Sequence, residues 1–148
     1  MKAPLKKEIY RIIDANLNRS REGLRVCEDI SRFILNSPRI TGQLKVLRHE
    51  ISDIVKTSMK SGIRFLECRD SETDVGRYSG TAKEMKRGGY TDIFMANIER
   101  VKESLRVLEE FFKLVDKKKS SELSTLRFKA YEIEKKAVKS LGALRNIR

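Results

Sequence analysis

Asparagine, arginine and glutamate recur at one fixed spacing in two segments of the chain. Residues 15–28 read ANLNRSREGLRVCE, and residues 96–109 read ANIERVKESLRVLE. On a helix of about 3.6 residues per turn, Asn16 and Asn97 each fall in the middle of an apolar stripe. Charged residues then follow each asparagine in steps of three and rotate away from the stripe: Arg19, Glu22 and Arg25 in the first segment, Arg100, Glu103 and Arg106 in the second.

Two interpretations fit a polar notch in an apolar stripe. A buried asparagine without partners costs about 1–3 kcal/mol, so another group should satisfy its side chain. One interpretation is a structural network, in which asparagine fixes helix register and arginine pairs with glutamate between helices. The other is a polar cavity, because helical bundles build ligand sites from the inward side chains of facing helices. The duplication favours the cavity, and we expect one composite site.

The stretch RDSETDVG, at residues 69–76, places three carboxylates close together. Asp70 and Asp74, with Glu72 between them, could hold Mg²⁺ through one or two carboxylates while water and phosphate complete the coordination. An ordinary acidic turn explains the same spacing equally well. The order of residues does not fit an EF-hand loop, so calcium binding of that kind is excluded.

The stretch KRGGYTD, at residues 86–92, places two glycines just ahead of an expected helix start. Exposed backbone N–H groups at Gly88 and Gly89, beside Lys86 and Arg87, could bind phosphate. The stretch matches neither the P-loop nor the dinucleotide-binding fingerprint, so it is weak evidence by itself.

Apolar periodicity predicts four helical segments, at about residues 5–35, 41–60, 91–118 and 121–141. Pro38 ends the first segment, because proline disfavours helical backbone at the residue before it. Thr91 is the expected N-cap of the third segment.

The repeat extends beyond the two opening phrases. LKVLRHEISDIVK, at residues 44–56, echoes LSTLRFKAYEIEK, at residues 123–135. We therefore predict an all-α fold in a single domain over residues 1–148. It is a helical bundle of two duplicated helical hairpins with pseudo-twofold symmetry. The two copies span about 9–60 and 91–141, and a long central loop at 61–90 joins them.

Composition excludes several classes of protein. The net charge of +12 is spread along every segment and interleaved with acidic residues, as on a solvated helix face, so we expect no nucleic-acid partner. No apolar run approaches the roughly 20 residues of a membrane span, and the N-terminus lacks a secretory signal. Cys27 and Cys68 match no metal spacing and are expected to be free thiols in the cytoplasm. Homo-oligomerisation stays open.

In combination these motifs resemble a known family. ANLNRSREGLRVCEDISRF, LRHEI, RDSETDVG and ANIERVKESLRVLEEF closely resemble the helical domain found fused ahead of thiamine-phosphate synthase, and also found alone. The resemblance covers roughly residues 9–135. It implies a role in thiamine biosynthesis, with thiamine-phosphate synthase as a candidate partner. The implied activity is ATP-dependent phosphorylation of 4-amino-5-hydroxymethyl-2-methylpyrimidine phosphate to the diphosphate.

The implied reaction suits the residues. The phosphate monoester is already anionic at neutral pH, because its second pKa is about 6, so no histidine base is needed. Positioning and electrostatic stabilisation carry such a transfer. Under the resemblance we expect catalytic roles for Arg69, Asp70, Asp74, Arg25 and Arg106, with Asp70 and Asp74 also holding Mg²⁺. Expected substrate-binding residues are Asn16, Arg19, Glu22, Asn97, Arg100, Glu103 and Gly76. The alternative is a non-catalytic module that binds pyrimidine phosphate or regulates thiamine-phosphate synthase.

Overall fold

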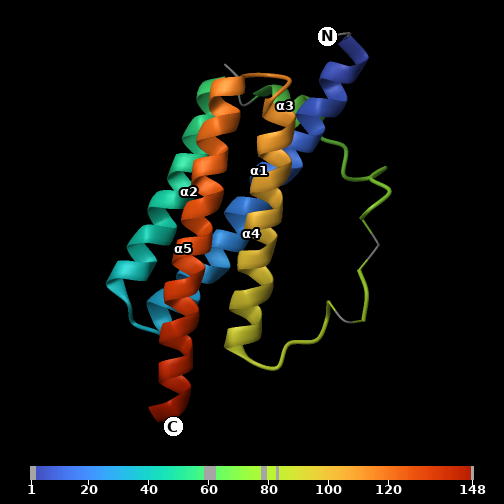
Figure 1. The fold of residues 1–148 in the computed structure, drawn as a ribbon. Helices are drawn as coiled ribbons and strands as arrows, with labels where there is room; N and C mark the ends of the chain where they lie inside the picture. The colour runs from blue at the N-terminus through green and yellow to red at the C-terminus, as the bar shows by residue number, and fades with distance from the viewer. Residues whose placement is uncertain (1–2, 59–62, 78–79, 83, 148) are drawn as a thin grey trace.

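Five α-helices make up the described part of the chain in the computed structural model, which covers residues 3–58, 63–77, 80–82 and 84–147 (Figure 1). The helices are α1 (Ala3–Phe33), α2 (Pro38–Ser58), α3 (Ile63–Cys68), α4 (Tyr90–Phe112) and α5 (Lys117–Ile147). The described residues form no β-strand, so the predicted all-α fold is confirmed.

The four long helices form a ring of neighbours. α1 packs on α2 and α4, and α5 packs on the same two helices. α1 and α4 run antiparallel. The Cys27 thiol of α1 donates to the backbone oxygen of Phe94 at 3.7 Å. Gly23, one turn earlier in α1, lies against Asn97 and Val101, which come later in α4.

The short helix α3 and the segment after it lie outside this ring. α3 packs on α1, where the rings of Tyr10 and Phe65 meet edge to face with their centroids 6.3 Å apart. Figure 1 shows the green-to-yellow connection from α3 running down the outer side of the bundle to the start of α4. The connection therefore returns the chain to the far end of the ring and leaves its first residues beside α1.

The sharp turn between α1 and α2 follows from three consecutive residues. Asn36 adopts the left-handed conformation, with a φ of 51°, which ends α1 in the way that asparagine and glycine favour. The Ser37 hydroxyl accepts a hydrogen bond from the Ile40 N–H at 3.2 Å, so Ser37 caps α2. Pro38 then occupies the first position of α2, where its missing N–H is harmless. The predicted stop at Pro38 is confirmed.

Several boundaries differ from the expectation. The last predicted segment, 121–141, is longer in the structure, where α5 spans Lys117–Ile147. α4 begins at Tyr90, so Thr91 lies inside the helix and is not its N-cap. α4 also ends at Phe112 rather than near residue 118, because Asp116 starts the next helix by accepting from the N–H groups that follow it. α3 lies within the segment expected to be loop. Residues 59–60, the expected end of the second segment, lie outside the described residues.

The core is built from the apolar stripes of the four long helices. Ile13, Leu24 and Cys27 of α1 are fully buried, as are Leu105 and Leu108 of α4. Burial is also the main reason that the pKa of the Cys27 thiol rises to about 12, and the nearby charges of two glutamates add to it. Cys27 is therefore an unreactive packing residue.

The two repeated phrases make corresponding contacts. Each asparagine donates its side-chain amide to the backbone oxygen four residues earlier, at 2.8 Å in both cases. The glutamate that ends each phrase pairs with an arginine of the following helix: Glu28 with Arg48 at 2.6 Å, and Glu109 with Arg127 at 3.0 Å. α2 and α5 differ in length, at 21 and 31 residues. The pseudo-twofold symmetry of the whole bundle stays a prediction.

Candidate functional site

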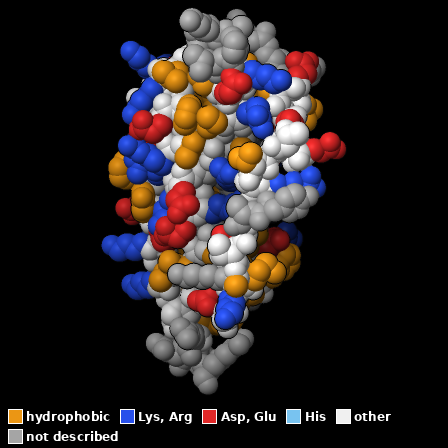
Figure 2. Space-filling model, turned by 90° about the vertical axis from the view of Figure 1, so that its right-hand side faces the viewer, with side chains coloured by type: hydrophobic (Ala, Val, Ile, Leu, Met, Phe, Trp, Pro, Cys, Tyr) orange, Lys and Arg blue, Asp and Glu red, His pale blue; other side chains and the backbone are white. Residues whose placement is uncertain are grey.

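A charged cleft lies between the first half of α1 and the segment that follows α3. Its volume is about 570 Å³, which is within the range of small-molecule sites. Ile12, Ala15 and Val107 supply apolar surface. Its charged lining residues are four acids and three arginines: Glu8, Asp14, Asp70, Asp74, Arg11, Arg19 and Arg69. Figure 2 turns this side of the bundle toward the viewer and shows basic and acidic side chains interspersed over it.

A bidentate ion pair fixes one wall of the cleft to the other. Arg69, just after α3, donates from Nε and Nη2 to the two carboxylate oxygens of Asp14 in α1, each at 2.8 Å. Asp14 is only 6% exposed, whereas the Arg69 side chain is 43% exposed. The hydrogen bonds that Arg69 donates to the Asp14 carboxylate raise the pKa of Arg69. The pair therefore anchors the RDSETDVG segment on α1.

Asp14 is the buried cleft residue that sequence reasoning missed, and Glu8 and Arg11 of the lining were missed as well. Asp14 stands directly between Ile13, in the apolar stripe, and Ala15, at the start of the repeated phrase. A carboxylate is rarely buried unless it is paired. An acid at the edge of an apolar stripe was therefore the available signal, but nothing in the sequence identified Arg69 as its partner.

The two carboxylates of the loop hold the loop itself in shape. Asp70 accepts hydrogen bonds from the hydroxyl of Thr73 and from its backbone N–H, the latter at 3.1 Å. These bonds hold the pKa of Asp70 below its usual range, the hydroxyl contributing most. Asp74 accepts from the backbone N–H of Gly76 at 2.8 Å. Arg11 adds a bond at 3.4 Å to the backbone oxygen of Asp70. These side-chain contacts are typical of turns built on aspartate.

The first repeated phrase contributes Asn16 and Arg19 to the cleft. Asn16 is buried, and its amide donates to the backbone oxygen of Ile12 at 2.8 Å. Arg19 Nη1 donates to Asn16 Oδ1 at 3.3 Å. The asparagine is therefore satisfied within its own helix, and it orients an arginine at the cleft wall.

The predicted site residues of the second repeated phrase lie away from this cleft. Asn97 faces Gly23, which is seven residues after Asn16, so the asparagines are separated by about 10 Å along α1. Arg100 and Glu103 are exposed on α4, as Glu22 is on α1. The structure thus brings Asn16, Arg19, Arg69, Asp70 and Asp74 together and leaves the predicted site residues of the second phrase outside this cleft, to which that phrase contributes only Val107 among the described residues. Ligand binding by Asn97, Arg100, Glu103 and Glu22 stays a prediction.

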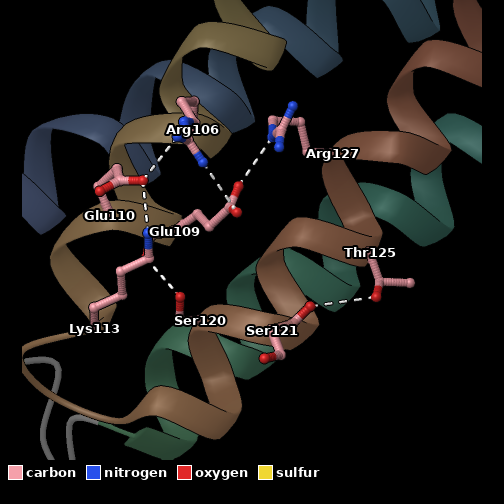
Figure 3. A network of polar contacts seen from close by, with 8 residues as sticks. All are labelled: Arg106, Glu109, Glu110, Lys113, Ser120, Ser121, Thr125 and Arg127. Carbon is pink, nitrogen blue, oxygen red and sulfur yellow. Dashed lines mark hydrogen bonds and ion pairs between the residues drawn. The ribbon is translucent and has the colours of Figure 1, made fainter.

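Arg25 and Arg106 occupy equivalent places in their phrases and join ion-pair clusters. Arg106 contacts Glu109 at 3.1 Å and Glu110 at 2.9 Å, and Glu109 also binds Arg127 of α5 (Figure 3). Arg25 lies 3.8 Å from Glu28 and lines a second cleft, of about 710 Å³, at the turn between α1 and α2. Neither arginine lines the first cleft, and their predicted catalytic role has no support from this geometry.

The glycine pair before α4 is already occupied by a carboxylate of the chain. The Gly88 N–H donates to Asp92 Oδ2 at 2.8 Å. A phosphate at this helix start would have to displace Asp92, so the geometry does not favour the predicted phosphate site.

The charges of the cleft are compatible with a magnesium ion. Among the described residues no group of three or more histidine, cysteine, aspartate or glutamate side chains could hold a metal ion. Magnesium, however, is usually held through one or two carboxylates together with substrate phosphates. Since Asp14 already neutralises Arg69, the negative charges of the other lining acids at least balance the positive charges of Arg11 and Arg19. Magnesium binding by Asp70 and Asp74 stays a prediction.

The fold and the cleft define an all-helical protein with a site of small-molecule size, lined by guanidinium and carboxylate groups. No described helix is long and apolar enough to span a membrane.

Comparison with known proteins identifies the family. A sequence model of the ThiD2 family matches residues 11–136. A thiamine-phosphate synthase of Nostoc sp. strain PCC 7120 is 36% identical over 130 residues, which cover 88% of this chain and 35% of the relative. That of Synechocystis sp. strain PCC 6803 is 37% identical over 126 residues, covering 85% and 35%. That of Rhodopirellula baltica is 35% identical over 127 residues, covering 84% and 33%. No solved structure matches the chain.

The chain belongs to the ThiD2 family. The predicted resemblance to a helical domain associated with thiamine-phosphate synthase is therefore confirmed. The chain spans about a third of the length of these curated relatives.

Proposed function

We propose that the chain acts in thiamine biosynthesis as a phosphomethylpyrimidine kinase. It transfers the γ-phosphoryl group of ATP to 4-amino-5-hydroxymethyl-2-methylpyrimidine phosphate. Membership of the ThiD2 family supports the pathway, and relatives named thiamine-phosphate synthase carry the matching segment. The observation that carries the proposal is a cleft of about 570 Å³ in which arginines and loop carboxylates converge. On this proposal the chain works in the cytoplasm, in association with thiamine-phosphate synthase.

The proposed reaction needs positioning more than proton transfer. A phosphate oxygen of the pyrimidine monophosphate attacks the γ-phosphorus of ATP, the bond from that phosphorus to the β,γ-bridging oxygen breaks, and ADP leaves. The nucleophile is already anionic at neutral pH, so no general base is required. Arg11 and Arg19 are the guanidinium groups in the cleft that could bind phosphate oxygens. A magnesium ion held by Asp70 and Asp74 would neutralise charge that builds up on the phosphoryl oxygens.

Arg69 takes a different part in this proposal from the one the sequence suggested. Its two side-chain bonds to Asp14 occupy one of the two edges through which a guanidinium can bind a phosphate bidentately. Arg69 therefore acts as a positioning residue, because it holds Asp70 and Asp74 against α1 at the mouth of the cleft.

Phosphorus NMR of the purified chain with the pyrimidine phosphate, ATP and Mg²⁺ tests the proposal. We expect a new pair of coupled diphosphate signals that disappears in Asp70→Asn. Glu72→Gln is the matched control, because Glu72 belongs to the same exposed loop but does not line the cleft. Product formed equally by all three proteins would refute the assignment of the site. Absence of product from the unaltered chain would refute the kinase activity.

One observation favours a second candidate, a non-catalytic module that binds pyrimidine phosphate or regulates thiamine-phosphate synthase. Asp70 and Asp74 already accept hydrogen bonds within their own loop, so a turn alone accounts for both residues. Calorimetric titration with the pyrimidine phosphate distinguishes the two candidates. Binding without turnover, unchanged in Asp70→Asn, supports the module, whereas turnover that depends on Mg²⁺ supports the kinase.

A further inference from the structure

Residues of α2 and α5 line an apolar groove. These two helices form the side of the ring opposite α1 and α4 (Figure 1), whose residues line the charged cleft. The volume of the groove is about 750 Å³. Val46 of α2 and Phe128 of α5 line it with 55% and 58% of their surface exposed. The side-chain carbonyl oxygen of Gln43 is buried there with no hydrogen-bond donor among the described residues. The groove therefore exposes apolar surface, and a buried carbonyl oxygen without a hydrogen-bond donor lies beside that surface.

The residues that line the groove recur at helical spacing. On α2 they fall at steps of three and four from Arg39 to Glu50, and on α5 from Thr125 to Lys136. Each helix therefore presents one continuous stripe on the outer surface. The neighbouring side of α5 faces the core with Leu126, and Ile133 belongs both to the core and to the groove. The outer stripe of α5 is mixed, because Phe128 lies among Lys129, Glu132 and Lys136.

Charge along the groove runs from basic to acidic. α2 and α5 run antiparallel. Lys129, near the start of the α5 stripe, pairs with Glu50, at the end of the α2 stripe, at 3.2 Å. The start of the α2 stripe therefore lies beside the end of the α5 stripe. Arg39 and Lys136 lie toward this other end together with Glu132, so it is basic by one charge.

The Glu50 end leads into a smaller hollow. Glu50, Asp53 and Glu122 line this hollow, and Asp53 is exposed to solvent. Lys129 and Lys119 pair with two of the three acids, so this end remains acidic by one charge.

We propose that a second copy of this chain occupies the groove, in a twofold dimer formed by α2 and α5 of both copies. A twofold interface uses the same surface on both partners. With the twofold axis perpendicular to the groove, the basic end of one groove lies against the acidic end of the other. Phe128 and Val46 of each copy are then buried between four helices. With a net charge of +12, two copies repel one another over most of their surface, and this groove is a surface where charges of both signs complement each other.

The dimer leaves the charged cleft accessible, because the cleft lies on the opposite edge of the ring. The inference is therefore independent of the proposed kinase activity, and the two can fail separately.

Sedimentation equilibrium of the full chain across the micromolar range tests the proposal. We expect a monomer–dimer equilibrium whose dissociation constant rises at least about tenfold in Phe128→Glu, as is typical of a central interface residue. Leu114→Glu is the matched control, because Leu114 is equally exposed but lies outside the groove. Circular dichroism confirms that each variant retains its helices.

A charge exchange tests the orientation of the two copies. Lys136→Glu weakens the dimer, and the double variant with Asp53→Lys restores it, because the two ends of the groove exchange sign. A chain that is monomeric throughout, or a dimer that Phe128→Glu leaves unchanged, overturns the proposal. A monomer would mean that a different protein covers the groove.

Discussion

The ion pair between Asp14 and Arg69 gives the sharpest prediction about the candidate site. Asp14→Asn removes the negative charge and one of the two acceptor oxygens but keeps the shape of the side chain. Arg69 then loses the bidentate contact that ties the loop to α1. We expect the loop to detach more often, while the helical ring stays folded, because Asp14 is the only one of the two residues that belongs to the ring.

The size of the effect follows from the exposure of the two partners. Hydrogen bonds to charged groups contribute about 1.5–3 kcal/mol where both partners are buried. The Arg69 side chain is 43% exposed, so water replaces part of the lost interaction. We therefore expect a loss of about 1–2 kcal/mol, which raises the population of the detached loop by a factor of about 5 to 30.

Amide hydrogen exchange of residues 69–77, measured against residues in the middle of α4, reports this opening. Glu110→Gln is the control, because Glu110 forms exposed ion pairs with Arg106 and Lys113, and exposed pairs contribute little. Faster exchange confined to the loop in Asp14→Asn alone is the expected result. If the amides of the loop exchange at the same rate in Asp14→Asn as in the unaltered chain, the reasoning is refuted.

Three further predictions concern the bundle and the loop. Gly23→Ala lowers the free energy of unfolding in urea by about 1–2 kcal/mol, because the new Cβ would lie 2.8 Å from the backbone oxygen of Asn97; an unchanged midpoint would contradict the close packing. Asn36→Gly leaves the midpoint of urea unfolding unchanged or slightly raised, whereas Asn36→Val lowers stability by about 1–2 kcal/mol, since φ is 51° there. Thr73→Val raises the pKa of Asp70 toward its ordinary value of about 3.9, measured by NMR titration of the carboxyl carbon. Because the folded-state pKa is the lower one, the unaltered loop gains stability from this carboxylate above its ordinary pKa and loses it as pH falls through the folded value.

Much of the fold could be predicted from residues near one another in sequence. The apolar stripes located the four long helices, and Pro38 marked the end of the first. The prediction failed where local signals were weak. The apolar pattern of α4 continues past Phe112, so nothing before Asp116 indicated that the helix ends there. The six residues of α3 are too few to show a clear period.

The candidate site was likewise only partly predictable from the sequence. The sequence indicated Asn16, Arg19, Asp70 and Asp74, and the structure places all four at one cleft. The sequence could not indicate that Asn97, Arg100 and Glu103 lie away from this cleft, because helical periodicity gives the face of a residue but not where two helices cross.

The sequence by itself determined the class of fold, the family and the kinds of side chain available to a site. Those depend on local periodicity and on residue types, which the order of amino acids states directly. Only the tertiary structure decided that Asp14 holds Arg69, since the two residues meet through the packing of α3 on α1. Only it decided that Gly23 faces Asn97, and so that the two asparagines do not share a cavity wall. Contacts between distant segments depend on how all the helices pack at once, and no single stretch of sequence contains that information.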